Sequence, residues 1–501
     1  MRSTSALFTS SAALCVFLGS LVGCTFKGER SDQPGGGGGG GSGGTAHHGA
    51  GGTGVQVDAG VFGDGPGPCQ NLQCRQNSCT RGPCVAQPCA AGVKTTVSGT
   101  VYDPAGKVPL YNVVVYVPNA HLDPVSEGAS CDRCGATLSG TVATALTDES
   151  GHFVLADVPV GDSVPLVIQV GKWRRELTLP TVASCADTAL TDKNLTRLPR
   201  NKSEGHIPKI ALTTGSADAL ECLLRKIGID DSEFTPESGT GRVNLFAGAG
   251  GTNRYSTPLN GGAALTGVEP WWDSVANLMG YDILLHSCEG TETPTNKSQM
   301  ARQAFLQYTS AGGRAFLSHW HNYWLEQGPA PLPMVATFDH QADLPSPFTA
   351  TLDTSFPKGQ AMATWLVNVG GSTTAGQLSI LAGQHTVDAA NPTFSQRWIY
   401  SDAVPGSRTQ TLRNPSVQYF TFNTPADAPA DQQCGRVVLS DIHVSNAGTP
   451  ADRSGTSYAF PTGCQAVDLS PQEKALEFML FDLSSCIIPD SGVPIPPTII
   501  P

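Results

Sequence analysis

Charged residues are scarce in this 501-residue chain: Asp, Glu, Lys and Arg together make up only 14%. Acidic residues outnumber basic residues, 42 to 30, which gives a net charge of −12 at pH 7. Lys and Arg form no basic stripe along the sequence, so nucleic acid is not expected as a partner. The abundance of Gly (57) and Pro (37) is instead typical of β-rich, loop-rich exported proteins.

The sequence also lacks a run apolar enough for a transmembrane helix, which needs about 20 strongly apolar residues. The best candidate, residues 6–23, is diluted by Thr9 and by three serines. Because it comes shortly after the basic residue Arg2, it predicts a secretory signal peptide over residues 1–23.

The signal ends in Leu21-Val22-Gly23-Cys24. This tetrad resembles the lipobox of bacterial lipoproteins, in which the cysteine is acylated and becomes the new N-terminus. The resemblance implies a lipid anchor at Cys24 and, because Thr25 is not Asp, an outer-membrane lipoprotein facing the periplasm or the exterior. The alternative is an ordinary signal peptide with a chance cysteine. Residues 24–67 are mostly Gly and predict a disordered tether.

Five cysteines then recur at every fifth position within residues 68–92. Thiols pair in an oxidising compartment, and this spacing does not match a zinc knuckle. We therefore predict disulfide bonds that link this segment covalently to the next domain. The alternatives are a metal site and a disordered segment with reactive free thiols. Because five is an odd number, at least one of these regularly spaced cysteines, which we call the ladder cysteines, must pair with a cysteine outside the segment. The connectivity of the bridges stays open. The expected set is Cys69, Cys74, Cys79, Cys84, Cys89, Cys131, Cys134 and Cys185.

Residues 93–205 predict an antiparallel β-sandwich, with strands at 96–103 and 111–119 and three more short strands before residue 178. The stretches SGTVYDPAGKVPLYNVVVYVPN and TDESGHFVLADVPVG resemble the carboxypeptidase regulatory-like domain, a transthyretin-like sandwich. That resemblance covers residues 97–172 and implies an accessory domain without catalytic activity.

Residues 206–488 alternate strands and helices, which predicts an α/β domain with a mostly parallel, flavodoxin-like sheet. A helix is expected over residues 216–228 with Ser216 as its N-cap, and a last helix after the capping box of Ser470 and Glu473. Residues 489–501 form a Pro-rich tail. The expected strands cover residues 207–215, 242–248, 281–287, 314–321, 417–425 and 435–445.

The stretches YDILLHSCEG, YTSAGGRAFLSHWH and GRVVLSDIHVS resemble the class I glutamine amidotransferase-like superfamily, in particular its ThuA-like branch. In the amidotransferases a Cys nucleophile ends the strand that matches RAFLSHWH, whereas Ser318 and His319 stand there in this chain. His443 matches the amidotransferase histidine. The resemblance therefore implies the fold without the amide-transfer nucleophile.

Seven polar side chains lie near predicted strand ends, where parallel sheets hold their sites. They are a speculative catalytic set of Cys288, His319 and His443 and a speculative binding set of His286, Glu289, His321 and Asp441. Three interpretations remain open: a structural cluster, a ligand pocket for a sugar, and a metal or hydrolytic site. No cofactor is predicted, with a metal ion at the histidine cluster as the alternative.

The first functional hypothesis is a lipid-anchored envelope protein that acts as a non-catalytic binding module for carbohydrate or an envelope protein. The alternative is a degenerate or novel hydrolase that uses Cys288, His319 and His443. An open cleft with these three side chains within hydrogen-bond reach would favour the enzyme.

The remaining cysteines carry three further expectations. Cys222 is expected to be a small core residue. Two of Cys434, Cys464 and Cys486 are expected to pair with each other. Cys288 is expected to be a free and partly accessible thiol.

If Cys24 carries the anchor, Cys24→Ala should release the protein from membranes, because one or more acyl chains supply the attachment. Fractionation of cells and incorporation of labelled fatty acid measure the effect. A variant that still sediments with membranes, beside a wild-type chain that takes up no label, would show that the lipobox interpretation is wrong.

Overall fold

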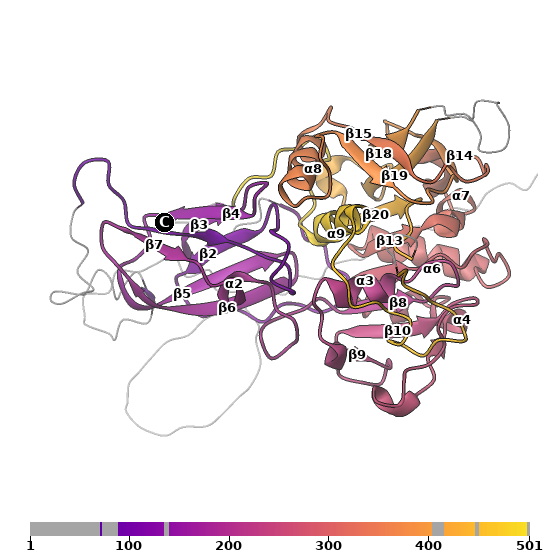
Figure 1. The fold of residues 1–501 in the computed structure, drawn as a ribbon, viewed down its shortest axis with the longest axis horizontal. Helices are drawn as coiled ribbons and strands as arrows, with labels where there is room; N and C mark the ends of the chain where they lie inside the picture. The colour runs from indigo at the N-terminus through magenta and orange to yellow at the C-terminus, as the bar shows by residue number, and fades with distance from the viewer. Residues whose placement is uncertain (1–70, 73–88, 135–139, 403–414, 446–449, 498–501) are drawn as a thin grey trace, which may run out of the picture. The chain divides into compact units, whose positions relative to one another are not determined.

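The structure is a computed structural model of the chain, and it describes residues 71–72, 89–134, 140–402, 415–445 and 450–497 (Figure 1). The described residues belong to one compact unit, residues 67–501. The expected signal peptide (1–23), Cys24, the tether (24–67) and the ladder cysteines at 69–84 lie outside the described residues. None of the described helices combines the length and the apolar character that a bilayer span requires.

Two small sheets come first in the chain. Their strands are β1 (Thr96–Thr100), β2 (Val114–Pro118), β3 (Thr141–Leu146), β4 (His152–Ala156), β5 (Gly161–Val170), β6 (Trp173–Val182) and β7 (Asp187–Leu190), followed by α2 (Lys193–Thr196). One sheet has the order β4-β1-β7 and the other β3-β2-β5-β6. Every pair is antiparallel except β1–β7. Four strands, not three, therefore follow β2 before residue 183.

Strand β4 illustrates why this stretch is extended. Phe153 and Leu155 are buried while Val154 is exposed, which is the two-residue alternation of a strand with one solvent face. The turn before it requires glycine: Gly151 has φ of +74°, and a Cβ there would lie 2.7 Å from Cβ of Pro109.

The larger part of the chain forms an eleven-stranded mixed sheet. Its parallel pairs involve β8 (Ile210–Thr213), β9 (Phe234–Thr235), β10 (Val243–Ala247), β11 (Thr266–Gly267), β12 (Ile283–His286), β13 (Arg314–Ser318) and β20 (Gly435–Ser440). Its antiparallel extension consists of β15 (Phe348–Leu352), β16 (Gln377–Ile380), β18 (Gln396–Ser401) and β19 (Ser416–Thr424). The order is β11-β10-β8-β12-β13-β20-β19-β18-β15-β16, with β9 beside β10. A separate two-stranded sheet pairs β14 (Ala336–Phe338) with β17 (Val387–Ala390).

The expectation of a mostly parallel sheet is therefore correct for one part of the sheet only. Strand β19 runs antiparallel to β20 because residues 425–434, which connect them, are too few for the crossover that parallel neighbours need. Strands β18, β15 and β16 continue the antiparallel pattern from there.

Helices and short 3₁₀ turns connect these strands. They are α3 (Leu220–Lys226), α4 (Val268–Trp271), α5 (Val275–Met279), α6 (Gln299–Ser310), α7 (Tyr323–Glu326), α8 (Pro357–Asn368), α9 (Pro471–Ser484), η1 (Asp231–Glu233), η2 (Asn260–Gly262), η3 (His319–Asn322), η4 (Leu332–Met334) and η5 (Ala430–Gln432). Alternate residues of β13 enter two different cores: Phe316 joins the one that contains α9, whereas Ala315 and Leu317 join the one that contains α6. The central strands are thus covered on both faces.

Helix α9 begins as the capping box predicts, with the Ser470 side chain accepting from the Glu473 amide and the Glu473 carboxylate accepting from the Ser470 amide. The helix expected over residues 216–228 is shorter, since only α3 is helical. Ser216 does not cap it, because its hydroxyl donates to the carbonyl oxygen of Glu289 at 2.7 Å.

Disulfides were expected, and four join described residues: Cys89–Cys185, Cys131–Cys434, Cys134–Cys486 and Cys222–Cys464. The first ties the last ladder cysteine to the loop before β7.

The other pairings correct the sequence-based expectations. Cys222 is buried in the core as expected, but it is disulfide-bonded and is not a free thiol. Cys434, Cys464 and Cys486 pair with distant cysteines and not with one another. These bridges span 242 to 352 residues, and the local pattern of a sequence does not show which distant loops meet in the fold.

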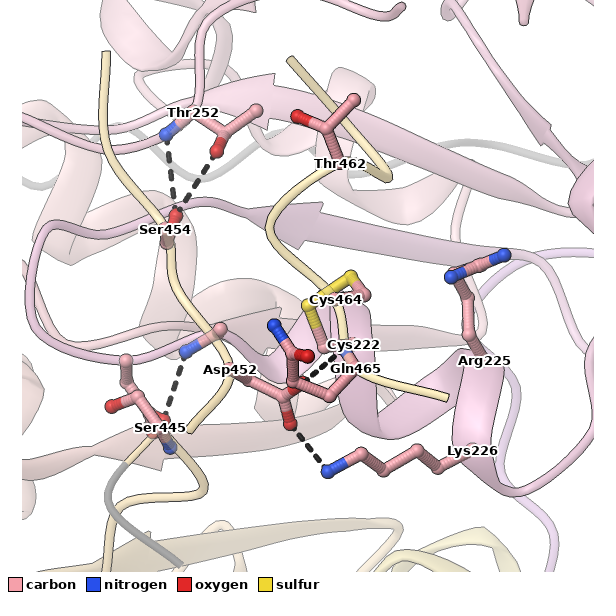
Figure 2. Close-up of a disulfide and its surroundings, with 12 residues drawn as sticks. Cys222, Arg225, Lys226, Thr252, Ser445, Asp452, Ser454, Thr462, Cys464 and Gln465 are labelled. Carbon is pink, nitrogen blue, oxygen red and sulfur yellow. Dashed lines mark hydrogen bonds and ion pairs between the residues drawn. A yellow bond between two sulfur atoms is a disulfide. The ribbon is translucent and has the colours of Figure 1, made fainter. Parts of the chain in front are cut away.

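Figure 2 shows how the Cys222–Cys464 bridge holds a late segment of the chain against α3. The same segment is bound by an ion pair of 2.5 Å between Lys226 Nζ and Asp452 Oδ2, both buried. Residues 450–465 are therefore attached by both covalent and polar contacts.

Replacing both Cys222 and Cys464 by alanine should lower the free energy of unfolding by about 2–4 kcal/mol, because the unfolded chain loses a long closed loop. Denaturant titration of the oxidised wild type and the double variant measures the loss, with Met300→Ala at an exposed helix position as the control. Recovery of Cys222 as a free thiol in non-reducing peptide mapping would contradict the pairing.

Candidate functional site

Three neighbouring parallel strands bring three donor side chains to one edge of the large sheet. Cys288 lies shortly after β12, His319 directly after β13, and His443 shortly after β20. Strand β13 pairs in parallel with both β12 and β20. Because the carboxyl ends of parallel strands share an edge, side chains distant in sequence meet there.

The ligand atoms of these three residues all lie within 4.8 Å of one another. Cys288 Sγ is 3.5 Å from His319 Nδ1, and the rings of His319 and His443 are 5.2 Å apart. The three residues are only 0%, 4% and 3% exposed. The expectation that Cys288 is partly accessible is wrong, because it lies in the protein interior with the Gly290 amide donating to its sulfur at 3.4 Å.

The buried carboxylate of Asp218 holds the segments that carry both histidines. Its Oδ2 accepts from the hydroxyl of Ser318 at 2.7 Å, and its Oδ1 accepts from the amide of Val444 at 2.9 Å. Ser318 directly precedes His319 in the sequence, and Val444 directly follows His443. His319 itself has φ of +42°, a left-handed conformation that a residue with a side chain keeps only where its surroundings enforce it.

Burial keeps all three groups uncharged. It raises the pKa of the Cys288 thiol to about 12, and the carboxylates of Asp218 and Asp441 add to the effect. Burial also lowers the pKa of His319 well below its ordinary value and lowers the pKa of His443. The thiolate is the reactive form of a cysteine, and a buried thiol with a pKa this high is protonated near neutral pH.

The histidines of the predicted binding set are engaged in the core. His321 Nδ1 accepts from the indole N–H of Trp324 at 2.9 Å, and its Nε2 lies 2.9 Å from the carbonyl oxygen of Ser287. His286 Nδ1 lies 3.0 Å from the hydroxyl of Thr213, and its ring stacks on Trp324.

The two predicted acidic residues are also bound within the protein. Glu289 Oε2 is 2.5 Å from Lys297 Nζ, and both side chains are buried. Asp441 accepts from the amide and the hydroxyl of Thr386 at 2.7 and 2.8 Å, while burial raises its pKa to about 7. Lys297 and Asp218 were missed because a single charged residue in a loop carries no sequence signal.

A second group of side chains, Glu292, Glu326, His340 and Trp320, is partly exposed near the same edge; we call it the rim cluster. His340 Nε2 lies 2.9 Å from Glu326 Oε2 and 3.6 Å from Glu292 Oε1. Trp320 meets His340 edge-on at 5.2 Å, and its ring lies 4.6 Å from that of His319. This cluster was not predicted, because Glu292 and His340 lie in loops outside the η3–α7 segment that carries Trp320 and Glu326.

No family model and no curated protein matches the chain. Among solved structures, it is similar to a ThuA-like protein from Bacteroides uniformis, with 8% identity, a TM-score of 0.28, and coverage of 55% of this chain and 91% of that one. Two cohesin–X–dockerin complexes from Acetivibrio cellulolyticus match at 18% identity, with TM-scores of 0.15 and 0.16. They cover 29% and 27% of this chain and 78% and 85% of their own. TM-scores this low carry no information on function.

Iodoacetamide should leave Cys288 unlabelled in the folded protein at pH 8, because the thiol is buried and its pKa is raised to about 12. Any slow labelling should keep rising through pH 10, whereas the labelling rate of an ordinary cysteine is half-maximal near its pKa of about 8.5 and levels off above it. Mass spectrometry of peptides before and after unfolding in guanidinium chloride measures the labelled fraction. Rapid labelling whose rate is half-maximal near pH 8.5, about the pKa of an ordinary cysteine, would contradict the burial of the thiol and restore the hydrolase alternative.

Proposed function

We propose that the protein is an exported, lipid-anchored envelope protein whose α/β body is a non-catalytic binding module, preceded by a β-sandwich accessory domain. One observation carries the non-catalytic part of this proposal. Cys288, the one free cysteine among the described residues, is completely buried and lies beside neutral imidazoles. The hydrolase alternative therefore lacks an accessible nucleophile.

The disulfides support the exported location. Four bridges join described residues, and such bridges persist in oxidising compartments. The anchor at Cys24 and the outer-membrane destination rest on the lipobox resemblance alone.

The rim cluster supports carbohydrate as the ligand class. The half-buried indole of Trp320 offers an apolar face against which the C–H groups of a sugar ring can pack. Beside it, the carboxylates of Glu292 and Glu326 are partly exposed acceptors for sugar hydroxyl groups. An aromatic face with a few directed polar groups is the usual composition of a small-molecule site.

Trp320→Ala and Glu326→Gln should each weaken oligosaccharide binding about tenfold or more, a loss of ~1.4 kcal/mol, because each removes one type of contact. A glycan array with the wild type selects the oligosaccharide, and calorimetric titration measures its affinity for each variant. Glu176→Gln, an exposed carboxylate on β6, is the matched control and should bind like the wild type.

Two outcomes would overturn the proposal. One is a wild-type protein that binds no glycan with a Kd below about 1 mM. The other is a hydrolytic activity that Cys288→Ala abolishes.

A further inference from the structure

We propose that Cys288, His319 and His443 form a binding site for one zinc-class transition-metal ion, with the sulfur and one nitrogen of each imidazole as ligands. This site goes beyond the carbohydrate-binding role proposed above and does not depend on it.

The spacing of the donor atoms matches the coordination sphere of such an ion. Zn–S and Zn–N bonds of about 2.3 and 2.05 Å at a tetrahedral angle place sulfur and nitrogen about 3.6 Å apart. Cys288 Sγ and His319 Nδ1 are 3.5 Å apart, and the third donor completes a set within 4.8 Å. The spacing of Cys288 and His319 therefore already suits an ion, and the donor of His443 lies close enough to complete the set by a side-chain movement of about 1 Å.

A second, independent observation concerns His443. Its Nε2 is buried and has no hydrogen-bond partner among the described residues. Leaving a buried polar atom without a partner destabilises the folded protein, so such atoms are rare unless they have a role. The contrast with His321 is direct, because both ring nitrogens of that residue have partners. The orphan nitrogen of His443 is free to act as a ligand.

The surroundings hold two of the donors in place before any ion arrives. Asp218 binds the chain neighbours of both histidines, so one carboxylate fixes the two segments relative to each other. Partners of this kind orient metal ligands and are as important as the ligands themselves. The carboxylate also adds negative charge close to the bound cation.

The chemistry of the donors selects the class of ion. Thiolate and imidazole suit Zn²⁺ and other borderline ions, whereas Mg²⁺ and Ca²⁺ prefer oxygen ligands. On binding, the S–H bond of Cys288 breaks, the S–metal bond forms, and the proton leaves to solvent. Two neutral imidazoles contribute lone pairs without losing a proton. Three protein donors leave one tetrahedral position for a water molecule or a small anion.

The test uses the purified exported chain, stripped with a chelator and then dialysed against Zn²⁺ or Co²⁺. The wild type should retain one zinc ion per chain by elemental analysis. Its Co²⁺ form should show a thiolate-to-cobalt charge-transfer band, which reports a Co–S bond directly and requires no variant. Affinity should rise with pH, because binding releases a proton.

Variants then identify the ligands. Cys288→Ser should abolish the charge-transfer band, and His443→Gln should weaken zinc binding at least tenfold. His152→Gln, an exposed histidine on β4, is the matched control and should leave both readouts unchanged. Glu326→Gln separates this site from the rim cluster and should also leave them unchanged.

The proposal is overturned if the wild type retains no zinc, if bound Co²⁺ gives no thiolate band, or if the band survives in Cys288→Ser. Loss of zinc in Glu326→Gln with retention in His443→Gln would place the ion at the rim cluster and would equally overturn it. Carbohydrate binding by the wild type is measured separately, so failure of either proposal is recognised without the other.

Discussion

One buried carboxylate, that of Asp218, determines the geometry of the sheet edge. It accepts hydrogen bonds from Ser318 after β13, from Val444 after β20, and from the amide of Ala219 at the start of α3. Bonds to a carboxylate are stronger than those between neutral groups. Loss of this group would leave buried donors without a partner and would release both histidine-bearing segments. The convergence of Cys288, His319 and His443 therefore depends on a residue that is not itself one of the three donors.

Burial of Cys288 also explains how a free thiol coexists with four disulfides. Eight described cysteines are paired, in bridges that reach across the chain. Cys288 is the free cysteine of the described part, and it is completely buried. Exchange with a disulfide requires an accessible thiolate, which this residue lacks. The same burial that removes Cys288 as a nucleophile therefore preserves it as a metal ligand in an oxidising compartment.

Features decided by neighbouring residues were predictable from the sequence, and features decided by distant ones were not. The apolar runs before Cys288 and His443 predict strands, and both are strands. The capping box at Ser470 predicts the start of α9. Strands β15, β16 and β18 were missed because no element was expected over residues 322–416, where the strands are short and their pairing is remote. The partner of Cys222 and the rim cluster depend likewise on which loops meet in the fold.

The charges around Cys288 limit what this site can do. A thiolate in the protein interior requires a nearby positive charge, and the imidazoles of His319 and His443 are held neutral by burial. Lys297 is a buried cation nearby, but it lies 2.5 Å from Glu289 and is neutralised by it. Neither the two imidazoles nor Lys297 therefore supplies a positive charge that would favour the thiolate form of Cys288. A metal ion between the three donors supplies this positive charge, which offsets the negative charge of the thiolate sulfur. Its coordination sphere also gives a partner to the unpaired Nε2 of His443.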